Sequence, residues 1–203
     1  MYLWKFELDL SNYNVQQGLR DRQKMHQMVT GLFGASRHDA SLLYRYIVVE
    51  RKVQLYMYSS IPMREEAISK DFKFSGGREV SDWLDGMKNG QIRNFDLLTM
   101  PSKKIKMKNQ KNSRRRLLLQ PEERMKWLQR KAEQNGFAIL SVREDPAERI
   151  FGIHPDERGG RLYLNTWRYS GVIQIQNEKL FRSAVENGIG PEKAYGLGMI
   201  LLA

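Results

Sequence analysis

The chain has 203 residues, a net charge of +11, 41% hydrophobic residues and no cysteine. This length and composition fit one domain or two small ones with packed cores, and the absence of cysteine excludes disulfides, thiol nucleophiles and thiolate metal sites. No apolar run approaches the roughly 20 residues that span a bilayer, and the N-terminal MYLWKFELDL alternates like a strand, so we expect a cytoplasmic protein with no membrane partner.

The first part of the chain predicts the order β-α-β-β-α-β. Its expected elements are a strand at 2–10, a helix at 15–33, a tight pair of strands at 42–50 and 52–59, a short helix at 62–68 and a strand at 71–75. Gly34 is expected to end the first helix, and Pro62 to open the second. This order is that of a ferredoxin-like unit, which we expect to close near Gly76 and Gly77.

The second part predicts the same order after a connector at 77–90. Its expected elements are a strand at 91–100, a helix from Pro121 to a stop at Gly136, strands at 137–142, 161–169 and 171–176, a helix at 178–187 and a final apolar strand. A hydrophilic loop is expected at 156–160. The sequence therefore predicts an α+β chain of two tandem ferredoxin-like domains, at 1–76 and 91–203, although the two parts share no sequence repeat.

One segment carries most of the net charge. Residues 103–116, KKIKMKNQKNSRRR, hold eight cations and no acid, which leaves +3 for the other 189 residues. Such a concentration indicates a surface that binds a polyanion, and nucleic acid is the expected partner. A membrane surface is the weaker alternative because the run lacks an amphipathic helical face. The expected RNA-binding cations are Lys103, Lys104, Lys106, Lys108, Lys111, Arg114, Arg115 and Arg116, and Lys126 and Lys131 extend the same surface.

The C-terminal NGIGPEKAYGLGMILLA is rich in glycine and contains one lysine, Lys193. Glycine lets backbone N–H groups approach an anion, so the loop is suited to hold a phosphodiester. The alternative is a glycine-rich turn between a helix and the last strand, and Tyr195 fits either base stacking or the core. The expected phosphate-binding residues are Gly188, Gly190, Lys193, Gly196 and Gly198.

His26 lies within the apolar arc of the first predicted helix, toward one border. The ordinary interpretation of such a residue is a histidine packed in the core, yet histidine is also the side chain that transfers protons near neutral pH. His38 and His154 fall in predicted loops and are expected at the surface. With these three histidines and no cysteine, we expect no metal site and no cofactor.

Four stretches together resemble the CasE family, the CRISPR repeat-RNA endoribonuclease of type I-E systems and a subunit of the Cascade complex. They are MYLWKFELDL, the helix from His26 to LF followed by LLYR, WLQRKAEQNGF, and NGIGPEKAYGLGMILL. The resemblance implies the tandem ferredoxin-like fold of RAMP-type RNA-binding proteins. It further implies a metal-independent cut in a CRISPR repeat stem-loop by 2′-OH attack, which leaves a 2′,3′-cyclic phosphate and a 5′-OH, and association with other Cascade subunits.

The resemblance puts His26 at the position of the family's catalytic histidine. Many members carry a tyrosine three residues earlier, whereas this chain has Gln23, which cannot act as a phenolic acid. Gln23 stays a catalytic candidate because its amide can donate a hydrogen bond to a phosphate oxygen. Lys24, Arg158 and Arg161 are further catalytic candidates that could supply the missing positive charge. Two alternatives remain. One is a non-catalytic subunit that binds hairpin RNA, suggested by Gln23, and the other is a general basic RNA-binding protein.

Overall fold

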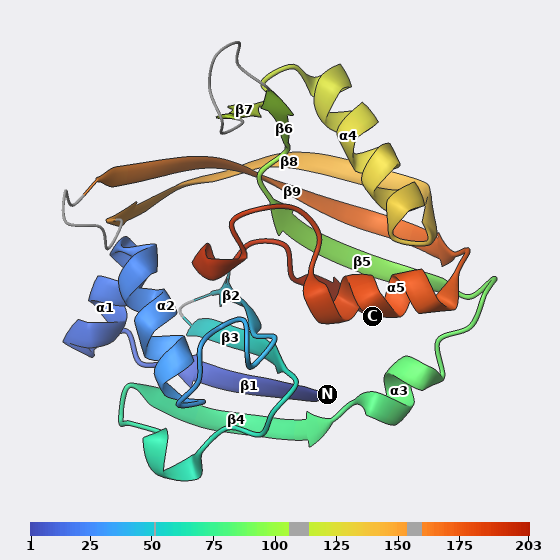
Figure 1. The fold of residues 1–203 in the computed structure, drawn as a ribbon. Helices are drawn as coiled ribbons and strands as arrows, with labels where there is room; N and C mark the ends of the chain where they lie inside the picture. Colours follow the sequence, from blue (N-terminus) through green and yellow to red (C-terminus); the bar gives the residue numbers. More distant parts are fainter. Residues whose placement is uncertain (51, 106–113, 154–159) are drawn as a thin grey trace.

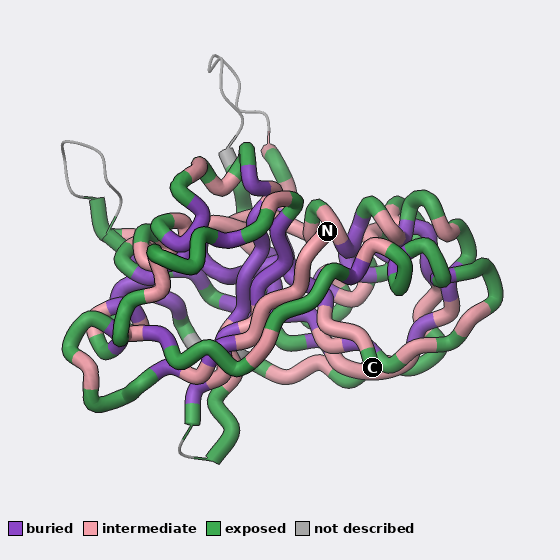
Figure 2. Tube along the Cα trace, turned by 90° about the horizontal axis from the view of Figure 1, so that it is seen from below, coloured by how far each residue is buried: buried purple, intermediate pink, exposed green. Residues whose placement is uncertain are grey.

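The structure, a computed structural model, describes the chain except residues 51, 106–113 and 154–159 (Figure 1). The described part contains two four-stranded antiparallel sheets and a separate two-stranded hairpin. None of its helices is long and apolar enough to cross a membrane. Figure 2 shows that the buried stretches gather where the strands and helices face one another, with exposed stretches around them.

The first sheet has the order β2-β3-β1-β4, with every neighbouring pair antiparallel. Its strands are β1 (Tyr2–Leu8), β2 (Leu43–Val49), β3 (Lys52–Ser59) and β4 (Phe72–Glu79). This order confirms the predicted ferredoxin-like unit. The unit does not close at Gly76 and Gly77, because β4 continues through them, and a Cβ at Gly77 would lie 2.3 Å from the Trp4 ring.

Two predicted helices of the first part differ from the structure. The helix expected at 15–33 is two helices, α1 (Tyr13–Arg20) and α2 (Arg22–Gly31). Asp21 separates them in an extended conformation, with φ −121° and ψ 107°, and its side chain accepts a hydrogen bond from the Gln23 N–H at 2.9 Å. The helix expected at 62–68 is only a 3₁₀ turn, η1 (Glu65–Ala67), which buries none of its residues and so lacks packing to extend it.

The second sheet repeats the arrangement with the order β10-β5-β9-β8. Its strands are β5 (Ile92–Thr99), β8 (Phe137–Ile153), β9 (Arg161–Ile175) and β10 (Ile200–Leu202). As predicted, α4 (Pro121–Gln134) begins at Pro121 and stops before Gly136, whose φ is +73°, and α5 (Glu178–Asn187) follows β9. Between β5 and α4 the basic segment forms the hairpin of β6 (Ser102–Ile105) and β7 (Arg114–Leu117).

The strands predicted at 137–142, 161–169 and 171–176 are two long strands. Gly171 does not interrupt β9: a Cβ there would lie 2.1 Å from the Ser141 carbonyl oxygen, so the glycine permits β8 to bulge between Ile139 and Ser141. A second irregularity lies between Pro146 and Arg149. Beyond it, residues 149–153 and 161–165 form a two-stranded ribbon whose far end lies beside α2 (Figure 1).

The two halves are joined by packing and by ion pairs. The larger core, built around Trp127 and Phe181, also includes Leu43 and Tyr58 from the first sheet. Buried Arg45 on β2 contacts Asp96 on β5 at 2.5 Å, and Arg168 on β9 pairs with the other oxygen of the same carboxylate. These contacts hold the first sheet in place against the second.

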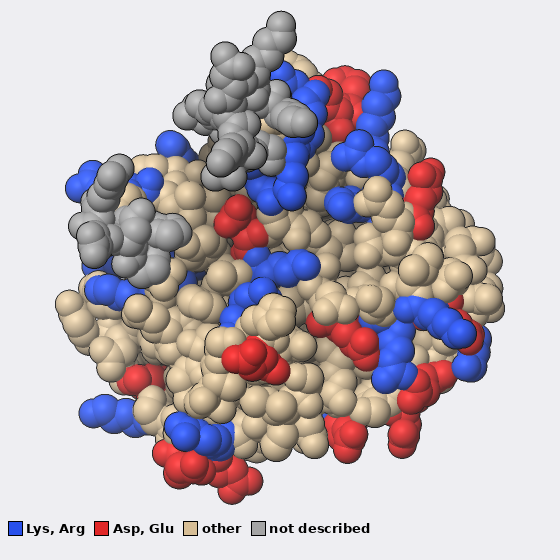
Figure 3. All heavy atoms as spheres, in the orientation of Figure 1, with Lys and Arg blue, Asp and Glu red and all other residues tan. Residues whose placement is uncertain are grey.

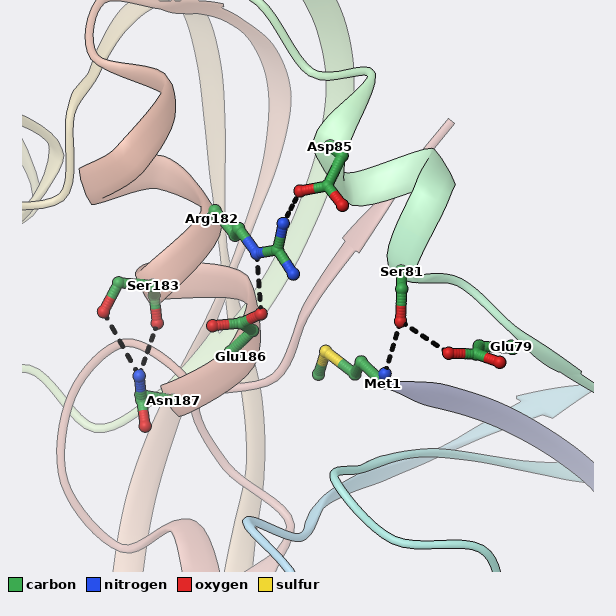
Figure 4. A network of polar contacts seen from close by, with 8 residues as sticks. All are labelled: Met1, Glu79, Ser81, Asp85, Arg182, Ser183, Glu186 and Asn187. Atoms are coloured by element: carbon green, nitrogen blue, oxygen red, sulfur yellow. Dashed lines mark hydrogen bonds and ion pairs between the residues drawn. The ribbon is translucent and has the colours of Figure 1, made fainter.

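Polar contacts also attach the connector to both halves (Figure 4). The connector contains α3 (Ser81–Asp85). The Met1 amino group donates to the Ser81 hydroxyl at 2.7 Å, and Asp85 forms an ion pair with Arg182 on α5. Helix α5, which leads into the glycine-rich loop, is therefore tied to the connector.

Candidate RNA-binding and cleavage site

A cavity of about 570 Å³ lies between the basic hairpin, α4 and the glycine-rich loop. Its lining contains no acidic residue and six cations: Lys103, Lys104, Arg115, Arg130, Lys131 and Lys193. Figure 3 shows Lys and Arg side chains gathered on this part of the face. The fold thus brings together the basic segment and the glycine-rich loop, which are more than 70 residues apart in the chain. We call this the cationic cavity.

Helix α4 contributes one face to the cationic cavity. Trp127, Arg130, Lys131 and Gln134 recur at helical spacing, so they share that face. The Lys131 ammonium donates to Gln134 at 3.0 Å, and burial, followed by the charges of Arg130 and Arg115, lowers the pKa of Lys131 below its usual value. Cations held so close to one another favour an anion between them, because a negative group removes their mutual repulsion.

The glycine-rich loop has a shape that requires its glycines. Gly188, Gly190, Gly196 and Gly198 all have positive φ, and a Cβ on Gly190 would lie 2.5 Å from the Thr99 hydroxyl. The N–H groups of Gly188, Gly196 and Gly198 donate to the carbonyls of Ala184, Lys193 and Leu98. These three donors therefore maintain the loop, which corrects the expectation that they face a phosphate. Gly188 and Gly190 line the cationic cavity.

The same loop brings Lys193 toward the N-terminal half. Lys193 begins the turn η2 (Lys193–Tyr195), which packs against α2, and the Tyr44 hydroxyl on β2 donates to the Ala194 carbonyl at 2.8 Å. Burial, followed by the charges of Arg37 and Lys131, lowers the pKa of Lys193. Lys193 also lines a second cavity, of about 430 Å³, together with Arg37 and Ser41. It therefore connects the cationic cavity to the residues around α2.

His26 lies half-buried on α2. Its Nδ1 atom is buried and has no hydrogen-bond partner within the described part of the chain. Burial and, second, the charge of Arg37 lower the pKa of the imidazole below its ordinary 6.5 and so favour the neutral ring. A neutral imidazole with a free nitrogen can accept a proton or hydrogen-bond a ligand.

Arg37 was not among the residues expected from the sequence. It follows α2 in the loop before β2, and its guanidinium donates to the Leu42 carbonyl at 3.4 Å. Its charge acts on both His26 and Lys193, and it lines the second cavity together with Lys193, so it lies near both residues. An isolated arginine in a loop has no periodicity or motif that could have identified it.

The other expected residues have different positions. Gln23 lies one helical turn before His26, whereas exposed Lys24 donates to Gln17 on α1 at 3.0 Å. Arg161 is exposed at the start of β9, and Arg158 lies outside the described residues, as do His154, the loop at 156–159, Lys106, Lys108 and Lys111. His38 is exposed, as expected.

Four further residues expected from the sequence are not among the described residues that line the cationic cavity. Arg116 lies outside the lining and pairs with Glu123 at 3.5 Å, and Lys126 lies in a small neighbouring cavity that shares Lys103. The backbone of Arg114 belongs to β7, and its side chain is not described. Tyr195 is 7% exposed and packs with Leu98 and Leu197, so the core interpretation of this residue is correct and base stacking is not available to it.

Comparison with known proteins identifies relatives along the whole chain. The model of the family described as CRISPR associated protein matches residues 1–203. The CRISPR-associated endoribonuclease Cse3 of Thermus thermophilus is 26% identical over 126 residues, and the alignment spans 58% of each chain, so just over half of that relative's length is matched. A structure of CRISPR endoribonuclease Cse3 bound to 19 nt RNA superposes with a TM-score of 0.86 at 19% identity, covering 100% of both chains. A chain of a CRISPR RNA-guided surveillance complex, pre-nicking, superposes with a TM-score of 0.77 at 21% identity, covering 100% of this chain and 99% of that one. The two structural matches establish the fold.

Proposed function

The chain belongs to the CRISPR associated protein family, and we propose that it is a metal-independent endoribonuclease that cleaves CRISPR precursor RNA at the repeat hairpin. The observation that carries the proposal is the position of His26, whose buried Nδ1 has no partner among the described residues, on the helix that packs against the turn of Lys193, a residue of the cationic cavity. The curated relative named as an endoribonuclease supports the reaction class. The protein acts in the cytoplasm and stays on its product as a subunit of a Cascade-type complex, a part of the proposal supported by the match to a surveillance-complex chain.

The reaction uses the RNA's own nucleophile. The 2′-OH loses its proton and attacks the neighbouring phosphorus, the P–O5′ bond breaks, and the departing 5′-oxygen takes up a proton. The products carry a 2′,3′-cyclic phosphate and a 5′-OH. His26 transfers a proton at this centre, a contribution of about 10²- to 10⁴-fold for a positioned acid or base. Arg37 and Lys193 stabilise the additional negative charge on the phosphorane-like transition state.

Backbone phosphates of the duplex stem bind at the cationic cavity. A-form RNA hides its base edges in a deep major groove, so a stem is bound mainly through its phosphates and its shape. Lys104, Arg130, Lys131 and Lys193 provide point charges and guanidinium donors along that cavity. Arg115 also lines the cavity, with Glu192 3.9 Å from its guanidinium. The turn of Lys193, which packs against α2, leads the RNA from the cavity toward the helix of His26.

A test of the enzyme is incubation of the purified protein with a labelled repeat stem-loop RNA in excess EDTA. Wild type is compared with His26→Ala and with Gln27→Ala, an exposed residue next to it on α2. We expect wild type and Gln27→Ala to cut and leave a cyclic phosphate, and His26→Ala to bind with nearly unchanged affinity without cutting. Normal cleavage by His26→Ala would refute the role of the histidine.

The second candidate function is a non-catalytic subunit that binds hairpin RNA, favoured by Gln23 at the position of the family tyrosine. It predicts tight binding of the stem-loop by wild type without turnover. Cleavage of the hairpin by the pure protein excludes this alternative. A general basic RNA-binding protein, in contrast, would bind unrelated RNA as tightly as the repeat hairpin.

A further inference from the structure

The outer face of the β8–β9 ribbon carries aromatic and basic side chains. Phe151 on β8 lies opposite Tyr163 on β9, with ring centroids 5.3 Å apart, and the Arg149 guanidinium lies 4.6 Å from the centre of the Tyr163 ring. Cross-strand partners share a face of a sheet, so Ile153 and Arg161, which pair further along, belong to the same face. We call Arg149, Phe151, Ile153, Arg161 and Tyr163 the outer platform.

The opposite face of the ribbon accounts for its folding. Ile150 and Leu164 are buried there in a core that includes Tyr195 of the glycine-rich loop. The outer platform contributes little to that core: Tyr163 is 50% exposed and Ile153 43% exposed, and both arginines are exposed. Aromatic rings on the solvent side of a ribbon that already has a core require a separate explanation.

The stacking of Arg149 on Tyr163 differs from the other arginine–aromatic contacts of the described residues. Arg22 over Tyr46 and Arg124 over Trp167 both involve arginines that are at most 7% exposed. These are interior contacts, whereas Arg149 and Tyr163 are both open to a ligand. An exposed ring beside a guanidinium is suited to an unpaired nucleobase, which stacks on the ring while its phosphate contacts the cation.

The outer platform lies close to the proposed cleavage site. Gly152, between Phe151 and Ile153, is placed so that a Cβ there would lie 3.8 Å from the Gln23 backbone nitrogen and from the Asp21 carboxylate. The inner face of the ribbon thus borders the start of α2, one turn before His26. The outer platform lies on the other face of the same two-stranded ribbon. Nucleotides that continue from a hairpin at His26 can therefore reach it.

We propose that the outer platform binds unpaired nucleotides that flank the hairpin, with a base stacked on Tyr163 and Phe151 and the phosphates against Arg149 and Arg161. The proposal rests on the proposed function for the position of the hairpin. It assigns the ribbon a second role: its inner face contacts the cleavage site, and its outer face binds the single strand that enters or leaves it.

The test measures affinity for two RNAs, the hairpin alone and the same hairpin with unpaired extensions that carry 2-aminopurine. The protein is His26→Ala, which leaves the RNA intact, with and without the double change Phe151→Leu and Tyr163→Leu. We expect the double change to weaken binding of the extended RNA about tenfold, within the range for base stacking, and binding of the hairpin alone by less than about twofold. Binding of the extended RNA to wild-type platform residues should quench the 2-aminopurine fluorescence, and the double change should abolish this quenching.

Phe74→Leu is the matched control, because Phe74 is also an exposed ring in an aromatic pair, on β4. It should leave both affinities unchanged, and thermal unfolding should show that all variants are folded. If the double change weakens binding of both RNAs equally, or leaves binding of the extended RNA unchanged, the proposed role of the outer platform is wrong. These results are independent of cleavage: a wild-type protein that never cuts the hairpin refutes the proposed enzyme, while an extension-specific loss of binding still supports the outer platform.

Discussion

The carboxylate of Asp21 accepts a hydrogen bond from the backbone N–H of Ile153, 3.2 Å away and 132 residues later in the chain. The same oxygen accepts the Gln23 N–H at 2.9 Å and so begins α2, the helix of His26. One buried side chain therefore determines where the histidine helix starts and where the end of the β8–β9 ribbon lies beside it.

Replacing Asp21 with alanine should uncouple the ribbon from the histidine helix. The variant loses an N-cap and leaves the Ile153 N–H without its acceptor, so we expect a loss of unfolding free energy of about 2 kcal/mol and slower cleavage with little change in affinity for the stem. Asn12→Ala is the control, because Asn12 caps α1 in the same way and makes no described contact with β8. Urea unfolding and single-turnover cleavage are measured for both variants. Equal effects of Asp21→Ala and Asn12→Ala would contradict the coupling of the ribbon to the histidine helix.

Arg37→Gln should raise the pKa of His26. Burial and the charge of Arg37 both disfavour the imidazolium, so removal of the charge allows protonation at higher pH. The titration is followed by NMR in a His38→Gln, His154→Gln background, where His26 is the one histidine left. Arg64→Gln, a change at an exposed arginine in the loop after β3, should leave the pKa of His26 unchanged. A downward shift in Arg37→Gln would refute this electrostatic relationship.

The same lowered pKa affects stability. Between the unfolded value of 6.5 and the lower folded value, the unfolded chain binds more protons at His26 than the folded chain. The contribution of His26 to stability is therefore complete above pH 6.5 and is lost as the pH falls through the folded pKa. Arg37→Gln should narrow the pH range between the folded and unfolded pKa values of His26, over which this stability is lost.

Lys193→Met should weaken binding of the hairpin and reduce its dependence on salt. Lys193 lines both cavities, so it is expected to contact a phosphate, and removing one such contact lowers the slope of log K against log salt by about one. Affinity of the wild type should itself fall steeply with salt. Lys179→Met, an exposed lysine on α5 outside both cavities, is the control. A slope that is the same in all three proteins would remove Lys193 from the RNA-binding site.

Gly190→Ala should destabilise the glycine-rich loop, whereas Gly31→Ala should not. Gly190 has φ +95° and a Cβ would lie 2.5 Å from the Thr99 hydroxyl, so we expect a loss of about 2 kcal/mol or more of unfolding free energy. Gly31 ends α2 with open space at its Cβ position, and alanine there should be neutral or stabilise by up to about 1 kcal/mol. Thermal unfolding of the two variants tests this difference.

Local patterns predicted most elements of the fold. Sequence signals that act over a few residues were sufficient for these elements. They include the alternation in β1 to β3, the proline and glycine at the two ends of α4, and the repeated order of elements. The prediction failed where a distant contact decides the local structure. Asp21 divides the first helix because its carboxylate is shared with Ile153, and Gly171 continues a strand because Ser141 approaches it.

The sequence by itself determined that a basic segment, a glycine-rich loop with Lys193 and a histidine at position 26 exist, because charge and glycine content need no fold to be counted. Only the tertiary structure decided that the basic hairpin, α4 and the glycine-rich loop enclose one cavity, that Arg37 lies near both His26 and Lys193, and that the outer platform forms. The physical reason is that these arrangements depend on strand register and on packing between residues far apart in the chain, which no local pattern encodes.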